Sequence, residues 1–130
     1  MITTRIIITR DMLQREPETL FVFGDNMEGR GYGGQAAAMR GEPNALGIPT
    51  KWRPANIPSA YFRDSDLPKV EQTIRDRFMR LEVHLACGKN VVWPEMGVRS
   101  GLASLQARAP AIYRLIEELK DNLFAEFGPG

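Results

Sequence analysis

The sequence predicts an α/β protein folded around a single sheet, and three observations support this prediction. The apolar run at residues 20–23 has the composition of a buried strand and leads into a glycine-rich loop, since half of the 12 glycines fall within residues 24–41. An Ala-rich, helix-forming stretch, residues 34–40, follows the loop. Longer stretches with apolar residues at helical spacing then alternate with strand-like runs. This order of strand, loop and helix is typical of α/β proteins, and 130 residues fit one domain.

The first half of the chain is expected to hold three strands and one helix. Residues 4–9 are β-branched and apolar, which predicts a buried strand. The strand at residues 20–23 and the helix at residues 34–40 come next. Residues 44–52 are predicted to form a third strand because they are largely apolar, and the prolines that follow predict an irregular loop over residues 53–63. We expect this loop to form one wall of a binding site.

The second half is expected to hold two long helices with a strand between them. Ser65 or Asp66 can cap the first helix, Pro68 fits its first turn and Gly88 is a natural stop. Its buried face is predicted to comprise Leu67, Val70, Ile74, Phe78, Leu81 and Leu85. Residues 90–93 are predicted to form the next strand. The last helix begins near Pro110, with a buried face of Ile112, Leu115, Ile116, Leu119, Leu123 and Phe127.

Composition excludes several classes of function. A formal net charge of +1 gives no field for duplex nucleic acid or an anionic membrane, so an anionic ligand must be held locally. Cys87 and His84 are the only residues of their types, which excludes a disulfide framework and argues against a zinc site. The apolar run at residues 6–8 is too short for a signal sequence or a membrane span. We expect a cytoplasmic protein without metal, cofactor or membrane partner, in which Cys87 is a small buried hydrophobe.

Two glycine loops follow predicted strands, and such loops can receive an anion on backbone N–H groups. Residues 29–34 form the first loop and residues 94–105 the second, and in the first loop the helix that follows would direct the positive end of its dipole at a phosphate. The spacing GRGYGG is not the dinucleotide fingerprint, and the chain has no Walker A motif. Glycine content alone leaves phosphate binding and a merely tight turn equally open.

Several segments resemble a macrodomain, the ADP-ribose-binding fold, and particularly its terminal ADP-ribose glycohydrolase type. The resemblance is carried by RIIITRDML, FVFGDNMEGRGYGGQAAAMRG, GIPTKW and VVWPEMGVRSGLASL, which follow one another in the family's order. It implies a three-layer sandwich with a central mixed sheet and helices on both faces. Two positions depart from the family's pattern: Arg10 replaces a glycine, and Ala103 stands where the glycohydrolase type has a catalytic aspartate.

The resemblance implies a set of site residues. Asp11, followed by Met12, would accept a hydrogen bond from the adenine amino group. The ligand's diphosphate and distal ribose would lie against the two glycine loops, at Gly29, Gly31, Gly33, Gly34, Gly97, Val98, Arg99, Ser100, Gly101 and Leu102. Lys51 falls on the family's nucleophile. Asp25 and Asn26, which end the second predicted strand, are further catalytic candidates and would face the same ribose.

The residue types leave alternatives at several of these positions. Lys51 could attack an anomeric carbon if burial or a neighbour such as Arg53 or Arg99 lowers its pKa, or it could stay charged and pair with a phosphate. Asp25 and Asn26 could hold ribose hydroxyls or merely cap a turn. Glu95 could supply the missing acid or be solvated. Tyr32 and Trp52 could stack on the ligand, whereas Trp93 is expected in the core.

Three functions remain open from the sequence. The first is binding of ADP-ribose or a related nucleotide diphosphate, with hydrolysis of ADP-ribosyl bonds by Lys51 and an ADP-ribosylated macromolecule as a further partner. The second is a non-catalytic nucleotide sensor or sequestering protein that uses the same pocket. The third is nucleic-acid binding, against which the near-neutral charge argues, through Arg53, Arg63, Arg75, Arg77 and Arg80.

Overall fold

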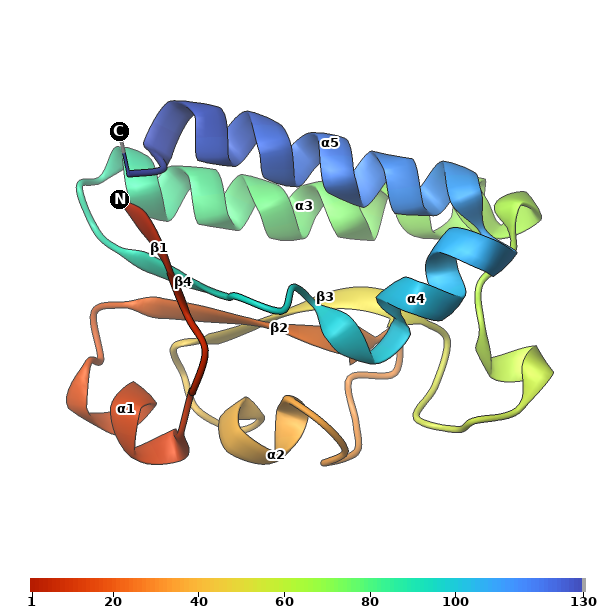
Figure 1. The fold of residues 1–130 in the computed structure, drawn as a ribbon, viewed down its shortest axis with the longest axis horizontal. Coiled ribbons are helices and arrows are strands. Elements are labelled where there is room, and N and C mark those ends of the chain that lie inside the picture. The colour runs from red at the N-terminus through yellow and green to blue at the C-terminus, as the bar shows by residue number, and fades with distance from the viewer. Residues whose placement is uncertain (130) are drawn as a thin grey trace.

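The fold was analysed in a computed structural model, which describes residues 1–129 apart from the side chains of residues 99–103. Strands and helices alternate along the chain (Figure 1). The elements are β1 (Ile2–Arg5), α1 (Arg10–Arg15), β2 (Leu20–Asn26), α2 (Ala36–Met39), β3 (Ala45–Lys51), η1 (Pro58–Ala60), η2 (Asp64–Asp66), α3 (Leu67–Ala86), β4 (Val91–Pro94), α4 (Arg99–Arg108) and α5 (Pro110–Phe127). The α/β class is confirmed.

The sheet has four strands in the order β1-β4-β2-β3, and every pair in it is parallel. For the described residues, the expectation of a mixed sheet was therefore wrong. Each strand is joined to the next along the chain by a segment that contains a helix, and such crossovers return the chain to run in the same direction. As a result the carboxyl ends of all four strands meet at one edge of the sheet.

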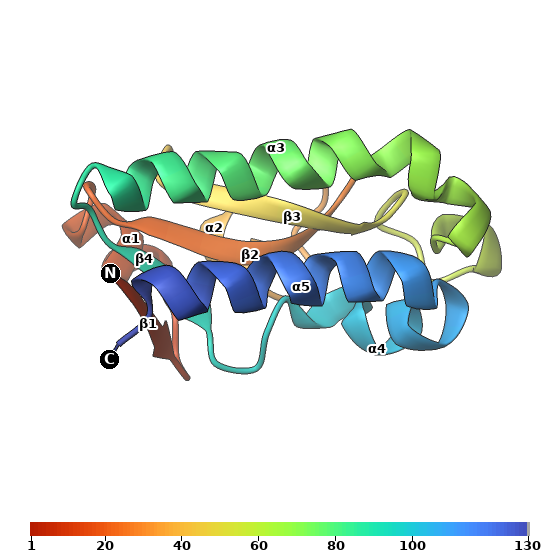
Figure 2. The same cartoon turned by 90° about the horizontal axis from the view of Figure 1, so that it is seen from above.

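Helices cover both faces of the sheet, as expected for three layers. Helices α3 and α5 lie side by side on one face, and the short α1 and α2 lie on the other (Figures 1 and 2). Helix α4 contacts β2 and β3. Each face has its own apolar cluster, a large one beneath α3 and α5 and a smaller one beneath α1 and α2.

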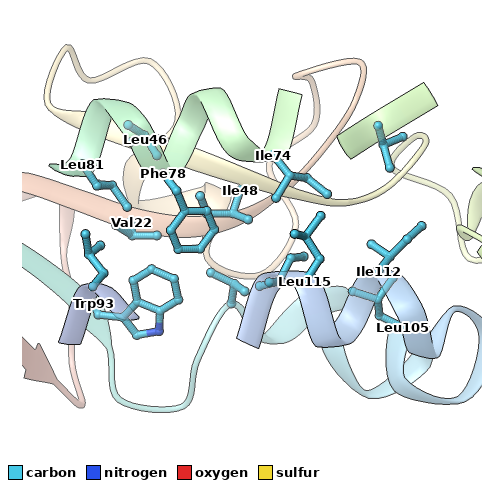
Figure 3. Packing of buried hydrophobic residues seen from close by; sticks show 14 of the residues in the cluster. Val22, Leu46, Ile48, Ile74, Phe78, Leu81, Trp93, Leu105, Ile112 and Leu115 are labelled. Atoms are coloured by element: carbon cyan, nitrogen blue, oxygen red, sulfur yellow. The ribbon is translucent and has the colours of Figure 1, made fainter. Parts of the chain in front are cut away.

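Helix α3 shows how the pattern of apolar residues builds the larger cluster. Pro68 lies in its first turn, as expected, and the helix ends before Gly88, which has φ +81°. Its predicted face is buried at Val70, Ile74, Phe78, Leu81 and Leu85. Trp93 lies beside Phe78 in the same cluster (Figure 3). Its ring centroid is 6.0 Å from that of Phe78 and 6.0 Å from that of Phe124. The prediction that Trp93 belongs to the core is confirmed.

The prediction of a strand at residues 4–9 was wrong. Strand β1 covers only Ile2–Arg5, and Ile6 and Ile7 are 75% and 68% exposed. The reason lies in the partner strand: β4 has four residues, and its last, Pro94, pairs with Arg5. A chain without a partner leaves the sheet, here to enter α1, which Thr9 caps by accepting from the backbone N–H of Met12.

Two further expectations were wrong. The helix expected at residues 34–40 is the single turn of α2, which leaves the chain without a long helix dipole behind the first glycine loop. Cys87 is exposed rather than buried, because it lies at the C-cap of α3, beyond the last residue of the buried stripe, Leu85.

Candidate functional site

A pocket of about 370 Å³ lies where β2 and β3 end. We call it the polar pocket and define it by its lining residues, which are Gly24, Asp25, Asn26, Arg30, Gly31, Tyr32, Gly33, Gly34, Ala36, Arg40, Lys51, Pro54 and Asn56. It brings together seven residues predicted from the sequence, namely Asp25, Asn26, Gly31, Tyr32, Gly33, Gly34 and Lys51. Ligands of open α/β sheets bind at this edge, beyond the carboxyl ends of the strands.

The first glycine loop needs glycine where it crosses the pocket. Gly31 has φ +94°, and a Cβ added to it would lie 2.9 Å from Cβ of Pro54, closer than side chains pack. Gly34 also has a positive φ, of +55°. These residues let the loop pass directly against the proline-rich segment that forms the opposite wall, as the sequence predicted for residues 53–63.

Asp25 and Arg40 form a buried ion pair beside this loop. Their side chains are only 7% and 14% exposed, and Arg40 donates to both carboxylate oxygens of Asp25. The Asp25 side chain also lies over Gly47 of β3, where an added Cβ would stand 2.6 Å from Cβ of Asp25. Asp25 is thus held from both sides, which favours a structural role for this carboxylate over the catalytic role expected from its place at the end of the strand.

Asn26, a lining residue of the polar pocket, carries an unused acceptor. Its Nδ2 donates to the Arg30 carbonyl over 2.9 Å, which fixes the orientation of the amide. Its Oδ1 is buried and has no hydrogen-bond partner among the residues that the structure describes. Buried polar atoms are nearly always paired, so this oxygen is suited to receive a donor from a ligand, such as a sugar hydroxyl.

Lys51 ends β3 with its ammonium group in the polar pocket. Nζ donates to the Ala55 carbonyl over 3.1 Å and to Oδ1 of Asn56 over 3.4 Å, and it lies 5.2 Å from the centroid of the Tyr61 ring. Desolvation by burial lowers the pKa of Lys51. Arg53, a proposed neighbour, instead donates to Ser59, so burial is the cause of the shift.

The second glycine loop is tied to the first by Gln35, which the sequence analysis missed. Gln35 Oε1 accepts from the Gly24 N–H, and Nε2 donates to the Gly97 carbonyl, both over 2.8 Å. Gly97 has φ +79°. Val98 is 1% exposed, and its side chain belongs to the larger apolar cluster and does not line the polar pocket. Arg99, Ser100, Gly101, Leu102 and Ala103 lie outside the described side chains.

Four other predicted residues do not line the polar pocket. Asp11 is exposed on α1 and pairs with Arg15 over 2.6 Å. Met12 packs against the smaller apolar cluster, and Gly29 lies in the turn that leaves β2. Trp52 packs on the larger cluster, with its Nε1 donating to Asp66 over 3.1 Å. Because successive residues of an extended chain face opposite sides, Lys51 in the pocket directs Trp52 away from it.

A second pocket adjoins the first, because Gly34 lines both. This apolar hollow has a volume of about 550 Å³ and is formed by Ile6, Ile8, Gly34, Gln35, Ala38, Met39, Pro94 and Met96. Of the two exposed isoleucines that leave β1, Ile6 therefore lies in the site region, together with the half-buried Ile8. The one amide in this lining, Gln35, already uses its oxygen and its nitrogen in the bonds to Gly24 and Gly97.

The fold and the site define a class: an α/β protein with a parallel sheet, helices on both faces, and adjoining polar and apolar pockets beside the glycine loops. The chain belongs to a family described as "Family of unknown function (DUF7831)", whose model matches residues 3–119. No curated protein and no solved structure matches it.

The described part of the chain has neither a helix that could span a membrane nor a cluster of metal ligands. None of its helices is both long and apolar enough to cross a membrane. Its His, Cys, Asp and Glu side chains do not gather in groups of three that could hold a metal ion.

Proposed function

We propose that the protein binds ADP-ribose or a related nucleotide diphosphate across the apolar hollow and the polar pocket. The observation that carries this proposal is that the two pockets meet at Gly34, beside a glycine loop at the carboxyl edge of a parallel sheet. A nucleotide diphosphate has the matching sequence of groups: a flat base, an anion and a sugar. The base would occupy the hollow, the diphosphate would lie along the loop, and the distal ribose would face Asn26 and Lys51.

The charges in the polar pocket fit this ligand. Lys51 supplies a cation for a phosphate or ribose oxygen, and the free Oδ1 of Asn26 accepts from a hydroxyl. Arg40 is neutralised by Asp25, which leaves the diphosphate to backbone N–H groups of the loop. Tyr32 is 66% exposed at the rim and can cover a bound ligand.

Binding is supported more strongly than hydrolysis. Lys51 has a lowered pKa, which favours the free amine that a nucleophile needs. The one carboxylate among the described lining residues of the polar pocket, Asp25, is held by Arg40 and is poorly placed to act as a base. A non-catalytic nucleotide sensor in a reducing, cytoplasmic setting is therefore the second candidate, and it would use the same pocket.

Nucleic-acid binding has less support. Of the five arginines considered for it, Arg75 pairs with Glu71 and Arg77 donates to the Gly47 carbonyl, so these two guanidinium groups are already engaged.

The proposal is tested by calorimetric titration with ADP-ribose, with AMP, NAD and ribose 5-phosphate titrated beside it. We expect micromolar binding of ADP-ribose. Ala38→Phe, which fills the hollow, should weaken it, whereas Ala37→Phe, on the exposed side of the same helical turn, should not. If none of the four compounds binds, the proposed function is wrong.

Hydrolysis is tested separately with an ADP-ribosylated protein as substrate. If Lys51 acts as the nucleophile, Lys51→Ala abolishes turnover and leaves ADP-ribose binding largely intact, while Lys69→Ala, an exposed lysine of α3, changes neither. Equal rates for Lys51→Ala and wild type would exclude Lys51 as the nucleophile. Ligand binding without any product from wild type would point to the sensor.

A further inference from the structure

Arg40 makes more contacts with the first glycine loop than an ion pair with Asp25 requires. Its Nε donates to the Gly31 carbonyl over 2.6 Å, and its Nη2 reaches the Arg30 carbonyl at 3.3 Å. The Arg30 carbonyl also accepts from Asn26, which follows Asp25 in β2. One guanidinium thus holds two consecutive peptide groups of the loop against the end of the strand.

These contacts determine which way the loop amides point. In a trans peptide the C=O and N–H groups point in opposite directions. Turning the carbonyls of Arg30 and Gly31 toward Arg40 therefore turns the N–H groups of Gly31 and Tyr32 away from it. Neither N–H donates to any group among the described residues. Adjacent free amides of this kind form a concave site that suits an anion.

A second observation at the same place points to a ligand. Asn26, a lining residue of the polar pocket, is 8% exposed, and its buried Oδ1 has no partner among the described residues. An unused acceptor thus belongs to a residue of the same pocket as the unused donors, a combination that a phosphorylated sugar would satisfy.

We infer that Arg40, anchored by Asp25, is a positioning residue that presents the loop amides to the diphosphate of the ligand. This inference rests on the proposed function. Arg40 acts through the loop and does not itself contact the anion, because its charge is neutralised by Asp25 and four of its five N–H donors are directed at Asp25 and the loop carbonyls. The site thus recognises a diphosphate by the geometry of its backbone.

Arg40→Lys separates geometry from charge. Lysine keeps the positive charge but lacks the planar fork that can hold a carboxylate and two carbonyls at once. The experiment titrates ADP-ribose, ADP and adenosine into wild type, Arg40→Lys and the control Arg77→Gln. Arg77 is also an arginine bound to a backbone carbonyl, that of Gly47, but it extends from α3 and does not contact the loop.

We expect Arg40→Lys to lower the affinity for ADP and for ADP-ribose by about tenfold or more, and to change the affinity for adenosine by less than about twofold. Arg77→Gln should leave all three affinities unchanged. Equal affinity of Arg40→Lys and wild type for ADP-ribose would overturn the inference. So would an equal loss for ADP and adenosine, which would mark Arg40 as merely structural. If wild type binds none of the three ligands, the proposed function itself fails.

A second variant keeps the test decisive if Arg40→Lys does not fold. The double substitution Asp25→Asn with Arg40→Gln removes both charges, so no unpaired buried charge remains. Its folding is checked by circular dichroism and thermal unfolding. A folded double variant that binds ADP-ribose as tightly as wild type would overturn the inference, and loss of ADP affinity with adenosine affinity retained would support it.

Discussion

Gly47 is a position where a single added carbon should disturb the sheet strongly. It lies in β3 beside the Asp25 side chain, and an added Cβ would come 2.6 Å from Cβ and 2.9 Å from Cγ of Asp25. Because Cβ is fixed to the backbone, rotation of the Asp25 side chain cannot relieve both contacts. In Gly47→Ala either the strands move apart or the ion pair with Arg40 is distorted.

The expected change in the free energy of unfolding is the sum of two destabilising terms and one stabilising term. Overpacking a tight site costs about 1–3 kcal/mol. Disturbing a buried ion pair adds to this, with about 3–5 kcal/mol as the limit for complete loss of one partner. Alanine restricts the unfolded chain and returns about 0.4–1 kcal/mol. We therefore expect Gly47→Ala to lower the free energy of unfolding by about 2–4 kcal/mol, a large part of the roughly 5–15 kcal/mol of a typical domain.

The assay is urea unfolding followed by far-UV circular dichroism, with Gly33→Ala as the matched control. A Cβ added at Gly33 meets no atom within 4 Å, so this variant should be as stable as wild type or slightly more stable. If Gly47→Ala is as stable as Gly33→Ala, the close packing of Asp25 against β3 is wrong, and with it our account of why the ion pair is rigid.

Three other predictions concern groups outside that contact. Hydrogen bonds from Arg5 lower the pKa of Glu16, so Glu16→Gln should cost up to about 1 kcal/mol at neutral pH for this partly exposed pair. The difference should vanish as acid protonates Glu16 through its lowered pKa; a difference that persists in acid would contradict the pairing. By NMR of methylated lysines, Lys51 should lose its proton at lower pH than Lys89, whose pKa a salt bridge raises; the reverse order would contradict the burial of Lys51. Cys87 should react with a thiol reagent in the native protein, and labelling only after unfolding would refute its exposure.

Burial of Lys51 also determines the direction in which stability changes with pH. Its lowered pKa means that the native state binds the proton more weakly than the unfolded state, so the charged form opposes folding. That penalty is present at neutral pH and is relieved as the pH rises through the lowered pKa. Wild type should therefore gain stability relative to Lys51→Met on the alkaline side.

The long helices could be predicted because their signal is local. The buried stripe of α3 repeats at helical spacing, so Ile74 and Phe78 were placed in the core without knowledge of their partners. The prediction of a strand at residues 6–8 failed for the opposite reason. A β-branched run predicts a strand, but the length of β1 is set by its partner β4, about ninety residues later in the chain.

The candidate site was predicted where the chain supplies it locally and missed where it is assembled at a distance. The end of the second strand and the glycines indicated Asn26 and the first loop, and the resemblance to macrodomains indicated Lys51. Arg40 and Gln35 were missed because their partners lie 15 and 62 residues away in the sequence. An arginine that directly follows a short Ala-rich helix, behind a strand that has Asp25 as its penultimate residue, is the signal that could have indicated the ion pair.

The edge position of β3 has a consequence for how these molecules meet one another. An outer strand is where a second chain can add to a sheet and begin an aggregate. Here Pro49 lacks the N–H that such an addition would use, and the Gly47 carbonyl already accepts from Arg77. The strand that supplies Lys51 is therefore a poor template for another strand, and concentrated protein should be protected against association along this edge.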